Sequence, residues 1–466
     1  MQLKSNKWLQ QTNPKLRLLK KLVWYSQGED LPYLKRKCTI ESTAKNATEQ
    51  LSFAICANLL PYLCTMVNVG IIGGGQLGMM TIEASSAEVP AHFTVLESSA
   101  DCPAKPLAQD FIAGSLTSDA SIRELATHVD VLTWEIEHIH VDALMQLKQE
   151  GKTIVPDPSV LKIIQNKGIQ KQHYTQHNIP TAPYVLTQYQ QISPELLTQF
   201  PGNEIVVKTC TGGYDGKGVS IVSKSDLLEK APFPGELLLE AKISPALEIS
   251  IIVAIGQTIN HQPPETCVYP AIEMYFHPIS NLVEFLFSPA RIHPSIEEKA
   301  KNIALQAVKS LNSAGLFAVE LFVVPAQTTD TEPLDYSLLS DKDVEILVNE
   351  IAPRPHNSGH HTIEGCHCSQ FEQFLRILTR KPLGNPALIK PAAMLNIVGP
   401  AHFSGTYTLE NQDYLQQRAD VFVHMYNKTE SKPNRKLGHA TILANTLEDL
   451  LKNAEDLKSK LTIIPS

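Results

Sequence analysis

The stretch "KTCTGGYDGKG" (208–218) decides the fold expected for this chain. Lys208 ends the apolar run "EIVVK", which predicts a β-strand, and four glycines keep the following turn free of bulky side chains. Such a hairpin can fold over phosphate groups and bind them through backbone amides, with Lys208 and Lys217 supplying positive charge. It is not a Walker A loop, because no G-K-[ST] sequence opens a helix here. The alternative is a glycine-rich hairpin with solvated lysines.

Two glutamates lie within apolar runs further along the chain. Glu320 is part of "FAVELFVV" (317–324), and Glu350 is part of "EILVNEIAPR" (345–354), with Asn349 beside it. An ionised glutamate in a buried strand is unfavourable unless it is paired or bound to a metal. We expect the two strands to be neighbours in one sheet, joined by an exposed loop at 326–343. The carboxylates would then suit Mg²⁺ bound to a nucleoside triphosphate, unless both face water.

The segment after Glu350, "NEIAPRPHNSGHHTIEG" (349–365), is dense in polar groups. Proline and glycine make it a loop with little to offer a hydrophobic core, and such loops commonly carry function. Arg354 can hold a bicarbonate or phosphate group through paired N–H bonds. His356 can act on protons near neutral pH.

The stretch "VGIIGGGQLGMM" (69–80) fits G-x-G-x-x-G through Gly73, Gly75 and Gly78, and Glu97 follows at about the spacing of a dinucleotide fingerprint. The same glycines serve any tight turn from a strand to a helix, so both interpretations stay open. No second dinucleotide half follows, and the later lysines and carboxylates suit nucleoside-triphosphate chemistry better than hydride transfer.

The pattern of predicted elements divides the chain into four parts. Residues 1–65 are polar and then apolar, and we interpret them as an N-terminal extension from an upstream start, with a transit peptide as the alternative. Residues 66–156 alternate strands and helices, which predicts a parallel, Rossmann-like sheet. Residues 157–390 predict an α+β domain, and residues 391–466 a small β-rich domain. We also expect one amphipathic helix over 159–177 and another from 294 that ends at Gly315.

Composition excludes some classes of protein. The net charge of −8 over 466 residues argues against a dedicated nucleic-acid surface. The apolar run "LSFAICANLLPYLCTM" (51–66) is short for a membrane span. The eight cysteines contain no C-x-x-C pair, which favours reduced thiols in a cytoplasmic enzyme, although "GCHCS" (365–369) leaves a metal site as the alternative.

Six motifs together resemble the 5-(carboxyamino)imidazole ribonucleotide synthase family, ATP-grasp enzymes of bacterial and fungal purine biosynthesis. They are "GGGQLGMM" (73–80), "TWEIEHI" (133–139), "KTCTGGYDGKGV" (208–219), "AVELFVV" (318–324), the run from Asn349 to Leu378, and "RKLGHAT" (435–441). The resemblance runs from about Met66 to the C-terminus. It implies an ATP-grasp fold with a Rossmann-like N-terminal domain and a small β-rich C-terminal domain. It also implies a homodimer that binds small molecules, with no nucleic acid and no membrane as partners.

The resemblance further implies that ATP and bicarbonate form carboxyphosphate, which carboxylates the amino group of 5-aminoimidazole ribonucleotide. The residues it assigns to ATP are Lys167, Lys208, Gly213, Tyr214, Asp215, Gly216, Lys217, Gly218, Glu240, Ile243, Glu248, Glu273, Asn349 and Glu350. Those it assigns to Mg²⁺ are Glu320 and Glu350. The catalytic positions are Asp215, Lys217, Arg354 and His356. The ribonucleotide positions are Gly75, Gln76, Leu77, Arg435 and Lys436.

Two residues depart from the family pattern: Met79 stands where arginine is common, and Asn166 where aspartate is usual. The rival functions are another ATP-grasp ligase, such as formate-dependent glycinamide ribonucleotide transformylase, and, from a different class, an NAD-dependent dehydrogenase.

Overall fold

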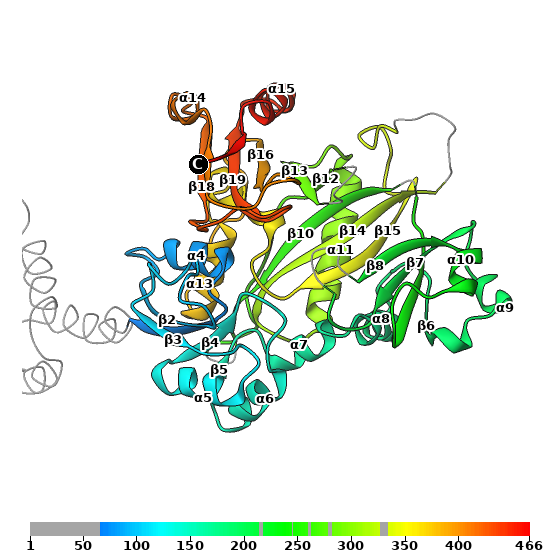
Figure 1. Cartoon of the computed structure of the whole chain (residues 1–466), viewed down its shortest axis with the longest axis horizontal. Coiled ribbons are helices and arrows are strands. Elements are labelled where there is room, and N and C mark those ends of the chain that lie inside the picture. The colour runs from blue at the N-terminus through cyan, green and yellow to red at the C-terminus, as the bar shows by residue number, and fades with distance from the viewer. Residues whose placement is uncertain (1–65, 214–217, 245, 260–261, 278–281, 327–333) are drawn as a thin grey trace, which may run out of the picture. The chain divides into compact units, whose positions relative to one another are not determined.

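A parallel sheet with the strand order β3-β2-β1-β4-β5 begins the described part of the chain (Figure 1). The computed structural model describes residues 66–466 apart from 214–217, 245, 260–261, 278–281 and 327–333. The strands are Val67–Ile72 (β1), Ala91–Glu97 (β2), Asp110–Ala113 (β3), Val131–Trp134 (β4) and Thr153–Ile154 (β5). The helices between them are Gln76–Glu83 (α4), Asp119–His128 (α5) and Val141–Gln149 (α6). The expected alternation of strands and crossover helices is confirmed here.

Two helices, not one, follow this sheet. Pro158–Ile164 forms α7 and Lys167–Gln176 forms α8, so the single helix predicted over 159–177 is wrong. The break lies at Asn166, whose backbone is extended and whose side chain accepts a hydrogen bond from the N–H of Ile169. An asparagine in this geometry starts a new helix. Lys167 is thereby fixed as the first residue of α8.

The glycine-rich hairpin belongs to an antiparallel sheet of order β6-β9-β7-β8. Its strands are Tyr184–Gln188 (β6), Glu204–Thr209 (β7), Val219–Ser223 (β8) and Glu236–Ala241 (β9), with the short helices Tyr189–Gln191 (η2), Pro194–Leu197 (α9) and Lys224–Glu229 (α10). The predicted hairpin is confirmed, because Lys208 pairs with Val219 across β7 and β8. The candidate residues Tyr214, Asp215, Gly216 and Lys217 lie outside the described residues.

The largest sheet has the order β15-β14-β10-β12-β13-β16-β19-β18, with β11 paired to β10. Its strands are Leu247–Ile255 (β10), Thr266–Val268 (β11), Ile272–Phe276 (β12), Val283–Ser288 (β13), Gly315–Pro325 (β14), Val344–Ala352 (β15), Ala392–Val398 (β16), Val421–Met425 (β18) and Lys436–Leu443 (β19). The predicted C-terminal strands therefore continue the central sheet through the β13–β16 pairing. The remaining C-terminal elements are Tyr407–Leu409 (β17), Gln412–Gln416 (α14), Leu447–Lys458 (α15) and Ile463–Pro465 (β20).

Helices cover both faces of the central strands. On one face α11 (Pro294–Ser310) packs in a core that includes Ile251 and Phe317. Residues one position along, such as Ile252, face a second core that contains α13 (Gln370–Leu378) and α4. This alternation buries the strands on both sides. The second core also joins the N-terminal sheet to the central one, and Met79 lies inside it with 2% exposure.

Helix α11 ends at Ser310 and not at Gly315 as predicted. The cause is Asn312, which adopts a left-handed backbone (φ 49°) two residues after the helix. Gly315 instead begins β14. Of the helices in the described part of the chain, none combines the length and the apolar character that a membrane crossing requires.

The buried imidazole of His361 is expected to make the fold less stable at acidic pH. Its side chain is buried, and burial lowers its pKa to about 4. Between that value and the ordinary pKa of histidine, the unfolded chain binds a proton that the folded chain does not. The free energy of unfolding should therefore fall as the pH falls, by about 2 kcal/mol from this residue between pH 7 and pH 5.

Urea unfolding of wild type and His361→Asn at both pH values measures this contribution. Asparagine keeps a donor for the carbonyl of Ser358, which lies 3.1 Å from Nδ1 of His361. The variant should lose about 2 kcal/mol less than wild type on acidification, whereas the exposed His128→Asn control should follow wild type. Equal losses in all three proteins would contradict the assignment.

Candidate active site

The two predicted glutamates are directly opposite each other on neighbouring strands. Glu320 of β14 pairs with Glu350 of β15, and the register shifts immediately after Glu320. Their side chains are neither fully buried nor fully exposed, at 18% and 41%. Burial, followed by the charges of Glu350 and Glu248, raises the pKa of Glu320, whereas the ammonium group of Lys167 lowers the pKa of Glu350. The predicted pairing of the two strands is confirmed.

Lysines from two elements approach this pair. Lys167 at the start of α8 donates from Nζ to Oε2 of Glu350 at 2.6 Å. Lys208 of β7 donates from Nζ to Oδ1 of Asn349 at 3.2 Å. The structure thus brings the sequence-predicted residues of four elements, α8, β7, β14 and β15, to one place.

A buried ion triad lies beside them. Glu240 of β9, 3% exposed, forms ion pairs with Lys208 and with Lys171, whose Nζ lies 2.6 Å from Oε1. Burial alone would raise the pKa of Glu240, but the charges of Lys208 and Lys171 prevail and lower it to about 2. Lys171 was not predicted. The available signal was its spacing, because it lies one helical turn after Lys167 and so on the same side of α8.

The remaining residues predicted to bind ATP, Glu248, Glu273 and Ile243, lie in three different surroundings. Glu248 of β10 lies near Lys208 and Glu320, and burial raises its pKa to about 7. Glu273 is not brought to this group. It pairs in register with Ile249, whose side chain packs in the core that contains α11, and its carboxylate is held by Arg291 at 2.9 Å from Nε. Ile243 packs against the core of the four-stranded sheet.

Gly213 and Gly218 flank the part of the hairpin that is not described. The carbonyl of Gly218 accepts a hydrogen bond from the N–H of Thr209 at 2.9 Å, which closes the described end of the hairpin. Gly218 has a left-handed backbone (φ 78°), and a Cβ there would lie 2.5 Å from Oγ1 of Thr209. A residue with a side chain would therefore disturb this end of the turn.

Arg354 and His356 extend the site toward the N-terminal sheet. Nη2 of Arg354 donates to Oε2 of Glu137 at 3.0 Å, and Nε of Arg354 lies at ion-pair distance, 2.8 Å, from Oε1 of the same carboxylate. Nε2 of His356 lies 3.6 Å from Oε1 of Glu320. The loop after β15 thus places both predicted catalytic side chains beside groups of other elements. Glu137 was not predicted as a partner, although it lies in the quoted "TWEIEHI".

The glycine turn at 73–78 is bound by the chain's own carboxylates. Glu135, which follows β4, accepts hydrogen bonds from the N–H groups of Gly75 and Gly78, the latter at 2.6 Å. Glu97 accepts from the N–H of Gly74 at 3.1 Å. Burial raises the pKa of Glu135, and the two amide hydrogen bonds oppose that rise. A dinucleotide pyrophosphate would have to displace these carboxylates, which argues against the dehydrogenase interpretation.

Three residues predicted to bind the ribonucleotide begin α4: Gly75 is its N-cap, and Gln76 and Leu77 are its first residues. Of the other two, Arg435 directly precedes β19 and Lys436 is the first residue of that strand. Lys436 is close enough to His360 for its charge to contribute to lowering the pKa of that imidazole, after burial and His439. Arg435 donates from Nη1 to the carbonyl of Glu430 at 2.7 Å. The first contact places Lys436 near the loop that carries His356, and the second joins Arg435 to the segment that precedes β19.

The cysteines near this loop are buried thiols. Burial raises the pKa of both Cys366 and Cys368 to about 12. Their side chains are 4% and 3% exposed, whereas His367 between them is exposed. Buried thiols with a raised pKa are protonated and unreactive, which favours reduced, structural cysteines.

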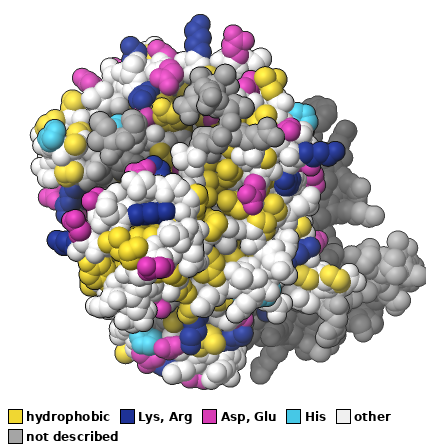
Figure 2. Space-filling view, turned by 90° about the vertical axis from the view of Figure 1, so that its right-hand side faces the viewer, with side chains coloured by type: hydrophobic (Ala, Val, Ile, Leu, Met, Phe, Trp, Pro, Cys, Tyr) yellow, Lys and Arg dark blue, Asp and Glu magenta, His cyan; other side chains and the backbone are white. Residues whose placement is uncertain are grey.

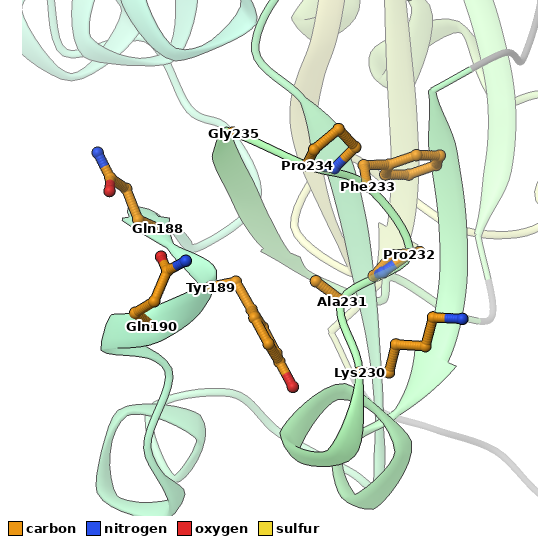
Figure 3. Close-up of a pocket in the computed structure, with 9 residues that line it drawn as sticks. All are labelled: Gln188, Tyr189, Gln190, Lys230, Ala231, Pro232, Phe233, Pro234 and Gly235. Atoms are coloured by element: carbon orange, nitrogen blue, oxygen red, sulfur yellow. The ribbon is translucent and has the colours of Figure 1, made fainter.

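A hollow of about 420 Å³ lies elsewhere, beside the four-stranded sheet and between η2 and the segment 230–235 (Figure 3). It is lined by Gln188, Tyr189, Gln190, Lys230, Ala231, Pro232, Phe233, Pro234 and Gly235. Gln188 pairs with Glu236, at the opposite end of the β6–β9 ladder from Tyr184 and Glu240. The hollow is therefore separate from the polar site.

The oxygen atoms around Glu320 and Glu350 suit a divalent cation. Carboxylates are the hard ligands that Mg²⁺ prefers. Burial, followed by the charges of Glu350 and Glu248, raises the pKa of Glu320, and a bound cation would favour its ionised form. Among the described residues, no group of three or more His, Cys, Asp or Glu side chains is arranged to hold a metal by itself. Mg²⁺ commonly completes its shell with substrate phosphates and water, so these two carboxylates fit a cation that arrives with a nucleotide.

Three family models match the chain in order. They are the ribonucleotide synthetase preATP-grasp domain at residues 66–165, the ATP-grasp domain at 172–371 and the phosphoribosylaminoimidazole carboxylase C-terminal domain at 392–453. Together with the glutamate pair and the lysines around it, these matches define the protein as an ATP-grasp ligase.

Relatives narrow the class. The N5-carboxyaminoimidazole ribonucleotide synthase of Bacillus subtilis is 34% identical over 80% of this chain and 91% of its own length. The chloroplastic phosphoribosylaminoimidazole carboxylase of Vigna aconitifolia is 35% identical, and the match spans 83% of this chain but only 66% of that protein. The chain belongs to the N5-carboxyaminoimidazole ribonucleotide synthase family.

Solved structures of this family have a similar fold. The synthetase from Thermotoga maritima superposes with a TM-score of 0.74 at 33% identity, over 86% of this chain and all of that one. The synthase from Aspergillus clavatus, in complex with ADP and 5-aminoimidazole ribonucleotide, has a TM-score of 0.70 at 28% identity, over 84% and 98%.

Proposed function

We propose that this enzyme uses ATP and bicarbonate to carboxylate the 5-amino group of 5-aminoimidazole ribonucleotide in purine biosynthesis. A bicarbonate oxygen attacks the γ-phosphorus of ATP, so that ADP leaves and carboxyphosphate forms. The ribonucleotide amine then takes the carboxyl group as a carbamate, with release of phosphate and a proton. The observation that carries the proposal is the Glu320–Glu350 pair, contacted by Lys167 and lying next to Lys208 and His356.

ATP would lie between the four-stranded sheet and the central sheet. We assign its phosphates to Lys208 and the glycine hairpin, including Gly213 and Gly218, and its base to the segment that contains Glu240 and Ile243. Tyr214, Asp215, Gly216 and Lys217 remain predicted members of this lid, and Glu248 and Asn349 predicted contacts of the nucleotide. Glu273 is better explained as a structural partner of Arg291, because it faces the α11 side of the sheet. Mg²⁺, held by Glu320 and Glu350, would supply charge neutralisation for the phosphates.

The reacting groups would meet beside the loop after β15. Arg354, oriented by Glu137, has the fork geometry that binds bicarbonate or carboxyphosphate. His356 would contact the same group, and Asp215 and Lys217 would complete the site from the hairpin. The ribonucleotide would bind between the turn at Gly75–Leu77 and the Arg435–Lys436 pair. Carboxyphosphate is unstable in water, which gives a closing lid a physical purpose.

We further propose the domain limits 66–156, 157–390 and 391–466, a homodimer, and a cytoplasmic location, with small molecules as the only partners. The distribution of surface charge supports the absence of nucleic acid among the partners. On the face shown in Figure 2, the described Lys and Arg side chains lie scattered among acidic and uncharged ones. Nucleic-acid surfaces instead gather basic residues.

Phosphate release from Mg-ATP with bicarbonate tests the proposed reaction. We expect 5-aminoimidazole ribonucleotide to stimulate release, and glycinamide ribonucleotide with formate to give no stimulation. Stimulation by the second pair alone would favour the transformylase, and absence of ATP turnover with either substrate would overturn the proposal. A parallel NADH titration, for which we expect no saturable binding, separates the dehydrogenase alternative.

A further inference from the structure

We propose that Ser358 and Ser250 are positioning residues that hold His356 with its proton on Nε2, so that its ring donates a hydrogen bond into the active site. The inference rests on the proposed role of His356 in binding bicarbonate and carboxyphosphate. It adds two residues from different elements to that role: Ser358 from the loop after β15 and Ser250 from β10.

The first observation concerns Nδ1 of His356. The backbone N–H of Ser358 donates to this nitrogen at 3.3 Å, and the same interaction caps the short helix Asn357–Gly359 (η3). A backbone N–H can only donate, so Nδ1 must present its lone pair. In the neutral imidazole the single proton then resides on Nε2.

The second observation is a pair of buried hydroxyls behind this nitrogen. Oγ of Ser358 lies 3.0 Å from Nδ1, and Oγ of Ser250 lies 2.8 Å from Oγ of Ser358. The two serines are 1% and 0% exposed. Each hydroxyl has one proton to donate. When the hydroxyl of Ser250 donates to Oγ of Ser358, the hydroxyl proton of Ser358 is free to be donated to Nδ1 of His356. Each group in the series from Ser250 to Ser358 to His356 then donates to the next.

The opposite side of the ring faces the reacting groups. Nε2 lies 3.6 Å from Oε1 of Glu320, and Ser250 pairs in register with Glu320 across β10 and β14. The backbone of His356 is also fixed, because its N–H donates to Oε1 of Gln370 at 3.0 Å and its carbonyl accepts from Nε2 of Gln370 at 2.7 Å. These bonds hold the backbone of His356, and the contacts of Ser358 with Nδ1 orient the ring.

The chemistry of the substrate explains why a proton on Nε2 of His356 would favour binding. Bicarbonate and carboxyphosphate present negatively charged oxygens, which need hydrogen-bond donors. A histidine with its lone pair on Nε2 would repel these oxygens. The backbone N–H of Ser358 disfavours that tautomer before the substrate binds, and the serine hydroxyls reinforce this when they donate toward Nδ1, which is preorganisation of a donor.

A double-mutant cycle tests the inference. We expect Ser358→Ala to lower kcat by about tenfold with little change in the KM for ATP, since a single hydrogen bond acts through the ring. His356→Gln keeps an amide donor near the position of Nε2, whereas His356→Asn keeps one only near Nδ1, so the glutamine variant should retain more activity. In the His356→Gln background, Ser358→Ala should change kcat less than about twofold, because its target is gone.

Ser250→Ala tests the other hydroxyl of the pair. This substitution should lower kcat when His356 is present but not in the His356→Gln background. Ser288→Ala removes a buried serine hydroxyl elsewhere in the sheet and should leave kcat unchanged in both backgrounds. Equal losses from Ser358→Ala in both backgrounds would overturn the inference, since they would show a general structural effect. Full activity of both His356 variants would instead overturn the proposed role of His356 itself.

Discussion

Replacing Glu350 by Gln is expected to reduce ATP turnover by roughly 10²–10³-fold, as removal of one preorganised charge from a transition-state site commonly does. The substitution removes one of the two carboxylates that fit Mg²⁺ and leaves Nζ of Lys167 without the negative charge it contacts at 2.6 Å. Phosphate release from Mg-ATP, with bicarbonate and 5-aminoimidazole ribonucleotide, measures the loss. A shift to higher Mg²⁺ requirement should accompany it, because fewer protein oxygens remain for the cation.

Glu345→Gln is the matched control, because Glu345 lies on the same strand and is exposed. It removes the same charge from β15 without touching the site and should retain wild-type turnover. Thermal melting of both variants separates a folding defect from a catalytic one. Wild-type turnover by Glu350→Gln at low Mg²⁺ would contradict the assignment of this carboxylate.

The elements that sequence predicted well are those defined by local pattern. Glu320 and Glu350 each interrupt an apolar run, and the polar stretch between the runs indicated neighbouring strands. The register that places them opposite each other confirms that expectation. The hairpin around 208–218 was equally clear, because strand and glycine signals adjoin there. Periodicity failed at Asn166, where a side chain that caps a helix outweighed a continuous amphipathic pattern.

The residues that sequence missed act through contacts between distant segments. Glu137 holds Arg354 from 217 positions away, and Ser250 meets Ser358 from 108 positions away. In neither pair does the sequence around one residue indicate which distant residue it contacts. The join between β13 and β16 is of the same kind, since a short apolar strand looks alike whether it ends one sheet or extends another. Lys171 was the exception, because helical spacing alone could have placed it beside Lys167.

Replacing Glu240 by Gln is expected to lower the free energy of unfolding by about 3–5 kcal/mol, the usual effect of removing one partner from a buried ion pair. Lys171 would remain buried, 3% exposed, with an uncompensated charge, and Lys208 would lose an ion pair as well. Urea unfolding measures the change. Glu204→Gln is the control, because its ion pair with Lys242 lies in the same sheet but is 35–51% exposed. Exposed ion pairs contribute at most about 1 kcal/mol to the free energy of unfolding, so the control should lose no more than that.

The pH dependence of the Glu240→Gln variant distinguishes an uncompensated charge from a packing defect. Burial lowers the pKa of Lys171, and Glu240 opposes that effect in wild type. Without Glu240 the folded-state pKa of Lys171 should fall further below its unfolded value, so the folded chain binds fewer protons. Stability then rises with pH across that interval, and the deficit of the variant should shrink between pH 7 and pH 9. A packing defect would give the same deficit at both values, and that result would show that the triad does not depend on charge.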